Sequence, residues 1–251
     1  MSAAPVELGR AFRVVKRWIK AQAGLDVFVR PQCSVPLLTL GEGPGSWVVS
    51  PDGLGSGSVL YSCGVGRDIS FERAMIDQFG LAVHAFDPTP LALTWARAQE
   101  LPVNFHLHEL GIAPYDGMAR FQPPSKLKFE SFSMVRSSGL GQPIEAPVRR
   151  FGTLAGMLGH SSVDILKMDI EGAEYEVLPD ILESRIPVGQ ILVEFHHRWK
   201  EVGATRTRQA IASLEAAGYV VAAVSSSGTE YTFIPKAATS ASRNSSFPSE
   251  V

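Results

Sequence analysis

The order of apolar and polar positions along the chain predicts strands and helices in alternation. Short apolar runs of the length of a buried strand are separated by segments in which apolar residues recur at helical spacing. The strands that we expect are 58–62, 81–86, 103–107, 163–168, 190–195, 219–224 and 231–234. The helices that we expect between them are 69–79, 91–99, 173–182 and 205–217. Strands that alternate with helices require crossover connections, so we expect an α/β fold with a mostly parallel sheet and helices on both faces.

The last two strands are an exception to this alternation. Only residues 225–228 separate the strand 219–224 from the strand 231–234, and this connection is too short for a crossover. We therefore expect these two strands to pair as an antiparallel hairpin at one end of the sheet.

The first 56 residues are expected to form an extension of the main domain. Residues 6–20 have the spacing of an amphipathic helix, and residues 41–57 form a glycine-rich, loop-like connection. We expect Phe12 and Trp18 to pack this helix on the domain while its Lys and Arg side chains stay in solvent.

The main domain is expected over residues 57–236 and carries one interruption. Residues 112–150 are rich in proline and glycine, which predicts an insertion of loops and short strands beside the third strand of the sheet. Residues 237–251 have little apolar content and are expected to be a disordered tail.

Composition and charge exclude several classes of protein. The chain has 251 residues with 45% hydrophobic positions, enough for a full core, and its formal net charge of −2 argues against a nucleic-acid binder. Its 2 cysteines, Cys33 and Cys63, exclude a disulfide scaffold and a cysteine-rich zinc site. No apolar run has the length of a transmembrane segment and no secretion signal is evident, so we expect a cytoplasmic protein.

A glycine-containing turn after the strand 58–62 is the first candidate binding site. Cys63, Gly64 and Gly66 lie where the chain passes from strand to helix, and glycines there let the backbone approach a ligand closely. Asp87 ends the next strand, 21 residues after Gly66, where an acid can accept both hydroxyls of an adenosine ribose. The alternative role of Asp87 is to cap the helix that begins near Pro88.

Two ligand classes use such a turn, the dinucleotides and S-adenosylmethionine. Ile69 occupies the place of the third glycine of a dinucleotide fingerprint. Asp68 would repel a pyrophosphate but attract a positively charged amino-acid group. These two residues favour S-adenosylmethionine over NAD.

A second acidic cluster follows the strand 163–168. Asp169 and Glu171 come directly after this strand and precede a helix, at the edge of the sheet where ligands bind in open parallel sheets. Their alternative role, which we accept for Glu174 alone, is to stabilise the N-terminus of that helix.

The strand 190–195 adds polar residues at the same edge. Glu194 and His196 share one face of this strand, while His197 points to the other, and which histidine faces the crevice stays open. A histidine beside acids can act as a base or as an oriented donor. Asp169, Glu171, Glu194 and His196 also have the ligand types of a divalent-metal site, for example for magnesium, although no spacing signature requires one.

With these residues in view, the chain resembles the FkbM-type family of S-adenosylmethionine-dependent methyltransferases over roughly residues 57–235. The segment 164–174, with the sequence DILKMDIEGAE, is similar to that family's signature almost letter for letter, and FDP at 86–88 and VEFH at 193–196 match in order and spacing. Ser62 departs from the pattern, since the family has an acid two residues before the first glycine, and Asp68 or Glu72 would then replace that acid.

The resemblance implies a Rossmann-like class I methyltransferase fold with a seven-stranded sheet and one reversed strand. It also implies transfer of a methyl group from S-adenosylmethionine, for many relatives to a hydroxyl of a sugar or small metabolite. The alternative is a non-catalytic cofactor-binding or interaction module of the same fold, suggested by the unusual first loop and the basic N-terminal helix. An NAD-linked oxidoreductase would leave the segment 169–172 without a purpose.

The site residues that we expect fall into two groups. The residues expected to bind the cofactor are Cys63, Gly64, Gly66, Asp68, Asp87, Pro88 and Glu109. The residues expected to be catalytic are Asp169, Glu171 and His196, with Asp169 or His196 as the base.

Overall fold

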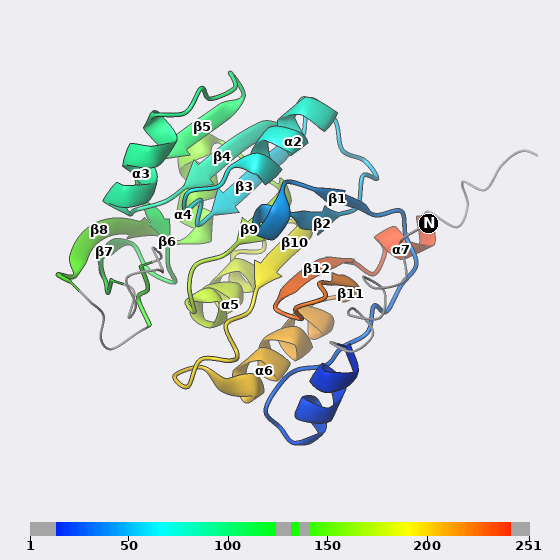
Figure 1. Cartoon of the computed structure of the whole chain (residues 1–251). Helices are drawn as coiled ribbons and strands as arrows, with labels where there is room; N and C mark the ends of the chain where they lie inside the picture. Colours follow the sequence, from blue (N-terminus) through cyan, green and yellow to red (C-terminus); the bar gives the residue numbers. More distant parts are fainter. Residues whose placement is uncertain (1–13, 124–131, 136–140, 242–251) are drawn as a thin grey trace, which may run out of the picture.

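The computed structural model describes residues 14–123, 132–135 and 141–241, and its centre is a seven-stranded sheet (Figure 1). The sheet has the strand order β11-β12-β10-β9-β3-β4-β5. Its strands are β3 (Val59–Cys63), β4 (Ala82–Phe86), β5 (Phe105–His108), β9 (Val163–Met168), β10 (Val188–Glu194), β11 (Tyr219–Val224) and β12 (Glu230–Pro235). All seven expected strands are present, and the expected α/β fold class is confirmed.

One strand of this sheet runs against the others. β12 pairs antiparallel with both β10 and β11, whereas the pairs from β10 to β5 are all parallel. The expected hairpin is therefore confirmed. The reversed strand is not the outermost one. After β10, helix α6 (Gly203–Ala216) leads to β11 at the edge of the sheet, and β12 then runs back between β11 and β10.

Helices cover both faces of the sheet. A hydrophobic cluster lies between the sheet and the helices on each face. Successive residues of β3 point to opposite faces, so Leu60 belongs to one cluster and Tyr61 to the other. The cluster around Leu60 includes α2 (Ser70–Phe79) and is contacted by α3 (Pro90–Arg97). The cluster around Tyr61 includes α4 (Phe151–Leu158), α5 (Glu174–Ser184) and α6. Helix α4 was not among the predicted helices, because its two glycines in eight residues give it a low intrinsic helix propensity.

The N-terminal helix occupies residues 14–22 among those described, and its orientation differs from the expected one. Arg17 is buried and donates hydrogen bonds to the carbonyl oxygens of Val27 and Ser225, at 3.3 Å each. Trp18 and Ile19 are instead 49% and 57% exposed. The expected packing through Trp18 is wrong, because backbone carbonyls on this side satisfy a guanidinium group. Phe12 and the first half of the expected helix lie outside the described residues.

A small antiparallel pair packs this extension onto the sheet. β1 (Leu38–Leu40) and β2 (Trp47–Val49) pair around a 3₁₀ turn at Gly43–Gly45, so the expected loop over 41–57 contains a strand. The Gln190 side chain on β10 bonds both to the backbone N–H of Ser50, at 2.8 Å, and to its carbonyl oxygen, at 2.7 Å. Side-chain bonding of this kind fixes the extension to the domain that carries the site.

The insertion forms the expected short strands. β6 (Gly111–Ile112), β7 (Gly117–Phe121) and β8 (Ile144–Arg149) make a three-stranded sheet beside the carboxyl end of β5. The segment expected to be a disordered tail begins with the short helix α7 (Ala238–Ala241), and its last ten residues lie outside the described part. No helix among the described residues has both the length and the apolar character needed to cross a bilayer.

Candidate functional site

A pocket lies at the carboxyl ends of β3, β4 and β9, under the insertion sheet. The loop after β3, the segment after β4, the start of the insertion and the loop after β9 each supply part of its wall. The main lining residues are Cys63, Gly64, Val65, Gly66, Arg67, Asp87, Pro88, Gly111, Ile112, Phe121, Phe132, Met134, Asp169 and Glu171. The loop of residues 63–67, which we call the glycine loop, therefore faces the same cavity as the acids of the 164–174 signature. This is what the geometry of parallel strands predicts.

The glycine loop is held tightly against the end of β9. Gly64 has a φ of 82°, and a Cβ atom there would lie 1.8 Å from the carbonyl oxygen of Asp169. The Asp169 N–H donates to the carbonyl oxygen of Cys63 at 3.0 Å. Burial raises the pKa of the Cys63 thiol to about 12, so this side chain is an uncharged part of the wall. Only glycine allows this close approach of the two strand ends.

Asp87 holds the other side of the same loop. Its Oδ2 atom accepts hydrogen bonds from the N–H groups of Val65 and Gly66, both at 3.0 Å. Its Oδ1 atom accepts from the N–H and the hydroxyl of Thr89, at 2.9 and 2.6 Å. The N-cap position of α3 is taken by Thr89, so the expected alternative of Asp87 as that cap is wrong. The carboxylate is buried and ties the glycine loop to the segment before α3.

A buried ion pair stands behind the loop, where Ser62 replaces the acid that the family pattern has. The Ser62 hydroxyl donates to Oε1 of Glu72 at 2.6 Å. The Lys167 ammonium lies 3.1 Å from the same carboxylate and donates to the Gly64 carbonyl oxygen at 3.3 Å. Glu72 thus brings a carboxylate to Ser62 from helix α2, and Lys167 neutralises it. A lysine inside a buried strand is the sequence signal for such a pair.

Two of the expected cofactor residues lie away from the pocket wall. Asp68 is exposed and accepts a hydrogen bond from the Ser70 N–H at 2.8 Å. Glu109 is exposed and forms an ion pair with Arg97 on α3. The structure does not bring these two carboxylates to the residues that it gathers around the glycine loop.

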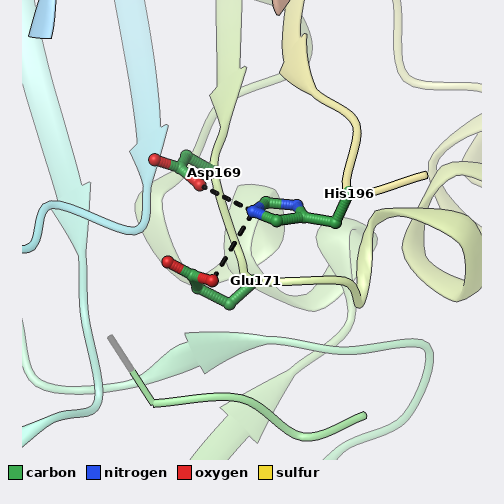
Figure 2. A group of neighbouring side chains, drawn as sticks. All are labelled: Asp169, Glu171 and His196. Atoms are coloured by element: carbon green, nitrogen blue, oxygen red, sulfur yellow. Dashed lines mark ion pairs between the residues drawn. The ribbon is translucent and has the colours of Figure 1, made fainter. Parts of the chain in front are cut away.

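The acids after β9 surround His196 (Figure 2). The Nε2 atom of His196 lies 3.8 Å from Oδ1 of Asp169 and 3.5 Å from Oε2 of Glu171, and the imidazole faces both carboxylates. Its Nδ1 atom lies 3.1 Å from Oε1 of Glu174. The His196 side chain is 8% exposed, whereas that of Asp169 is 33% exposed. The structure therefore shows His196 as the histidine at this site.

Its neighbour His197 points to the opposite face. The Nε2 atom of His197 bonds to Oδ1 of the buried Asp26 at 2.7 Å, and Arg198 pairs with the other oxygen of that carboxylate. Burial is the main influence on His197 and lowers its pKa. His197 thus attaches the N-terminal segment to the domain and takes no part in the pocket.

The loop between β9 and α5 is shaped to aim its acids. Glu174 stands in the first turn of α5, but the hydrogen bonds that it accepts, from the N–H groups of Ile170 at 3.0 Å and Gly172 at 3.3 Å, hold the loop before the helix and do not cap it. Glu171 has a φ of 54°, which is rare and costly for a residue with a side chain. The Ser133 hydroxyl holds this conformation by donating to the Glu171 carbonyl oxygen at 2.6 Å. Strain of this kind is maintained by the surrounding contacts and directs the Glu171 carboxylate toward His196.

The crowding of carboxylates shifts their pKa values. Burial and then the Glu171 charge raise the pKa of Asp169 to about 6. Burial and then the Asp169 charge raise the pKa of Glu194 to about 8. Burial opposes the charging of His196, but Glu174, Asp169 and Glu171 outweigh it and raise the pKa of His196 to about 10. The grouping of acids thus disfavours the charged forms of Asp169 and Glu194 and favours the charged form of His196.

Aromatic and sulfur-containing residues of the insertion form the outer wall of the pocket. Phe121, Phe132 and Met134 line it opposite the glycine loop. These three residues were not predictable from the sequence, because nothing in their spacing shows that β7 and the residues near 133 fold back over the pocket.

Comparison with known proteins agrees with this arrangement. The profile of the methyltransferase FkbM domain matches residues 62–221, more than half of the chain and the part that builds the pocket. The chain belongs to this family. The probable methyltransferase-like protein 24 of Rattus norvegicus is 28% identical over 145 residues, and that of Homo sapiens is 27% identical over the same length. Each alignment covers 56% of this chain and only 33% of the relative, so the chain spans about a third of their length.

Solved structures resemble this FkbM-family domain more distantly. A complex of the Haloferax volcanii Trm112 methyltransferase activator with a putative methyltransferase aligns with 87% of this chain and 75% of that chain, at 15% identity and a TM-score of 0.38. A putative transferase of Pyrococcus horikoshii aligns with 90% of this chain and 82% of that chain, at 9% identity and a TM-score of 0.33.

Proposed function

We propose that this protein transfers the methyl group of S-adenosylmethionine to a hydroxyl oxygen of a sugar or another small metabolite. The observation that carries the proposal is that the glycine loop and the carboxylates of Asp169 and Glu171 line one pocket. The first can hold a nucleoside cofactor and the second can receive the acceptor. Membership of a methyltransferase family supports the same reaction class.

In this proposal the cofactor lies along the glycine loop. The backbone of Gly64 and Gly66 passes beneath it, and the apolar wall from Pro88 and Ile112 suits the adenine ring. The negative charge of the rim favours a sulfonium ion and disfavours the pyrophosphate of NAD. Asp87 would contact the ribose only by sharing oxygens that already accept four hydrogen bonds within the protein.

The methyl transfer is a single displacement. The acceptor oxygen forms a bond to the methyl carbon, the carbon–sulfur bond breaks, and its electron pair stays on sulfur to give the neutral thioether. Most of the rate comes from alignment of the oxygen with the methyl group. The hydroxyl proton goes to Asp169 rather than to His196, because the Asp169 side chain lines the pocket whereas that of His196 is buried beside it.

The test combines binding with turnover. We expect calorimetry to show binding of S-adenosylmethionine and its demethylated product in preference to NAD, and we expect a labelled methyl donor to modify one or more members of a panel of hydroxylated small molecules. Tighter binding of NAD would overturn the proposal. Binding of the methyl donor without transfer to any acceptor favours the alternative of a non-catalytic cofactor-binding module, for which the fully hydrogen-bonded Asp87 is the supporting observation. The acceptor and the cytoplasmic location stay predictions.

A further inference from the structure

We propose that Asp169, Glu171 and His196 bind a divalent first-row metal ion of the Mn²⁺ type at the acceptor side of the pocket. The proposal that this ion also positions the acceptor rests on the proposed methyl transfer, whereas binding of the ion does not.

The three side chains have the spacing of ligands around one ion. One oxygen of each carboxylate and the Nε2 atom of His196 all lie within 4.8 Å of one another. The separations of 3.8 Å and 3.5 Å from Nε2 to Asp169 and Glu171 exceed those of a good hydrogen bond. Ligand atoms that each lie about 2.0–2.2 Å from a common ion have mutual separations of roughly 3–4 Å. Two carboxylates and one imidazole are a donor set that first-row ions accept readily.

Unsatisfied buried atoms point to the same conclusion. Oδ1 of Asp169, the atom that faces His196, is buried and has no hydrogen-bond partner. Buried polar atoms without partners are rare in folded proteins, and each indicates a strained group or a missing ligand. His196 is more than nine-tenths buried, and its Nε2 atom points at the carboxylates without a hydrogen bond of normal length (Figure 2).

Glu174 supplies the outer support that metal-binding histidines usually have. Its Oε1 atom lies 3.1 Å from Nδ1 of His196, an ion-pair contact outside hydrogen-bond geometry, and the carboxylate is itself held by the N–H groups of Ile170 and Gly172. A carboxylate on the second ring nitrogen fixes the imidazole orientation and makes the first nitrogen a better ligand. The same loop therefore carries two ligands and the group that orients the third.

The charge of the site also calls for a cation. Three carboxylates, those of Asp169, Glu171 and Glu174, have an oxygen within 3.8 Å of a ring nitrogen of His196. The ammonium group of Lys167, on the strand that leads to Asp169, is already paired with Glu72. A divalent ion would relieve this repulsion more fully than one imidazolium can.

An ion at this place has a direct use in the proposed reaction. Asp169 and Glu171 both line the pocket, so the positions that they leave open on the ion face the acceptor. A bound hydroxyl loses its proton more readily, and the second oxygen of Asp169, which is turned away from His196 in Figure 2, is available to take it. Three protein ligands leave room for two substrate oxygens. The acceptor class that fits is therefore a vicinal diol or a hydroxyl beside a carbonyl.

The test measures ion binding without cofactor or acceptor. The full chain is treated with a chelator, the chelator is removed, and Mn²⁺ is titrated while electron paramagnetic resonance reports the free ion. We expect one site, with an affinity that falls at least about tenfold in Glu171→Gln and in His196→Gln. Glu183→Gln, which changes an exposed acid on α5, is the matched control and should bind like the wild type. Circular dichroism confirms that each variant is folded, and Glu171→Gln keeps the test decisive if His196→Gln does not fold.

The outcomes separate this inference from the proposed function. Absence of Mn²⁺ binding at millimolar concentration, or equal binding by Glu171→Gln and the wild type, overturns the metal site. Methyl transfer that persists with excess chelator overturns the role of the ion in positioning the acceptor, while it leaves the proposed function in place. Binding that depends on Glu171 in a protein that transfers no methyl group supports the metal site and removes the proposed reaction.

Discussion

The backbone of Gly64 lies so close to the carbonyl oxygen of Asp169 that a Cβ atom would stand 1.8 Å from it. The loop that we assign to the cofactor and the acid that we assign to the acceptor are therefore in direct contact through their backbones. A change in one must displace the other.

The first prediction follows from this contact. Gly64→Ala adds a methyl group where there is no space and at a φ of 82°, so we expect it to lower the free energy of unfolding by about 2–5 kcal/mol and to abolish cofactor binding. Gly66→Ala is the control, since its φ of 58° is also positive but nothing lies within 4 Å of its Cβ position. We expect it to cost only about 1 kcal/mol. Urea unfolding and calorimetry with S-adenosylmethionine check both variants, and equal effects would contradict the steric explanation.

The second prediction concerns Asp87. Asp87→Ala removes four hydrogen bonds and leaves the N–H groups of Val65 and Gly66 without their acceptor. Hydrogen bonds to a charged group contribute about 1.5–3 kcal/mol each, so we expect both a clear loss of stability and a loss of at least tenfold in cofactor affinity.

Thermal unfolding separates the two roles of this carboxylate. If Asp87 acts only through the loop, the loss of affinity should shrink when binding is measured far below the melting temperature. A loss of affinity that is the same at all temperatures indicates direct contact with the ribose. An unchanged melting temperature would contradict the four hydrogen bonds that the structure shows.

The third prediction concerns the buried pair of Lys167 and Glu72. Lys167→Met leaves the buried Glu72 carboxylate with the Ser62 hydroxyl but without a counter-charge, and breaking such a pair costs about 3–5 kcal/mol. The double variant Glu72→Gln/Lys167→Met removes both charges and should recover most of that loss. Chemical denaturation of the two single variants and the double variant forms a complete mutant cycle. Additive effects would show that the pair contributes no coupling.

The residues found at the site show what sequence reasoning can and cannot provide. Asp169 and Glu171 were predictable because they follow a strand that is apolar enough to be buried on both faces, and such strands end at one edge of the sheet. Asp68 was predicted at the cofactor because it follows the glycine turn and could attract a positively charged amino-acid group, but its side chain turns to the Ser70 N–H, a local bond that competes with any ligand. The burial of Arg17 was not predictable, because its partners, the carbonyl oxygens of Val27 and Ser225, are brought to it only by the folded domain.

A cluster of histidines on the sheet face opposite α2 is a second feature that was only partly predictable from the sequence. His84 bonds to His108 through ring nitrogens 3.0 Å apart, and its ring contacts those of His106 and His160. Tyr61 bonds to His160 at 2.7 Å. The alternation of strands explains why His84, His106 and His108 share a face, whereas the approach of His160 depends on the end of α4.

The last prediction follows from this cluster and concerns acid stability. Burial, and then the charges that His108, His106 and His160 acquire on protonation, lower the pKa of His84 to about 4, and burial also lowers the pKa of His108. Between pH 6.5, the ordinary pKa of a histidine, and pH 4, the lowered value, the unfolded chain therefore binds more protons than the folded chain. The contribution of His84 to the free energy of unfolding is thus fully present above about pH 6.5 and is lost as the pH falls toward 4. His84→Phe keeps a ring among these neighbours but cannot be protonated, so we expect its melting temperature to fall less steeply than that of the wild type over this range. Asp169, whose pKa is raised, titrates in the same range with the opposite sign, but it is present in both proteins and cancels in the comparison. Gln78→Ala, a change at an exposed position on α2 across the sheet from this cluster, is the control, and equal slopes for wild type and His84→Phe would show that His84 is not the group that limits acid stability.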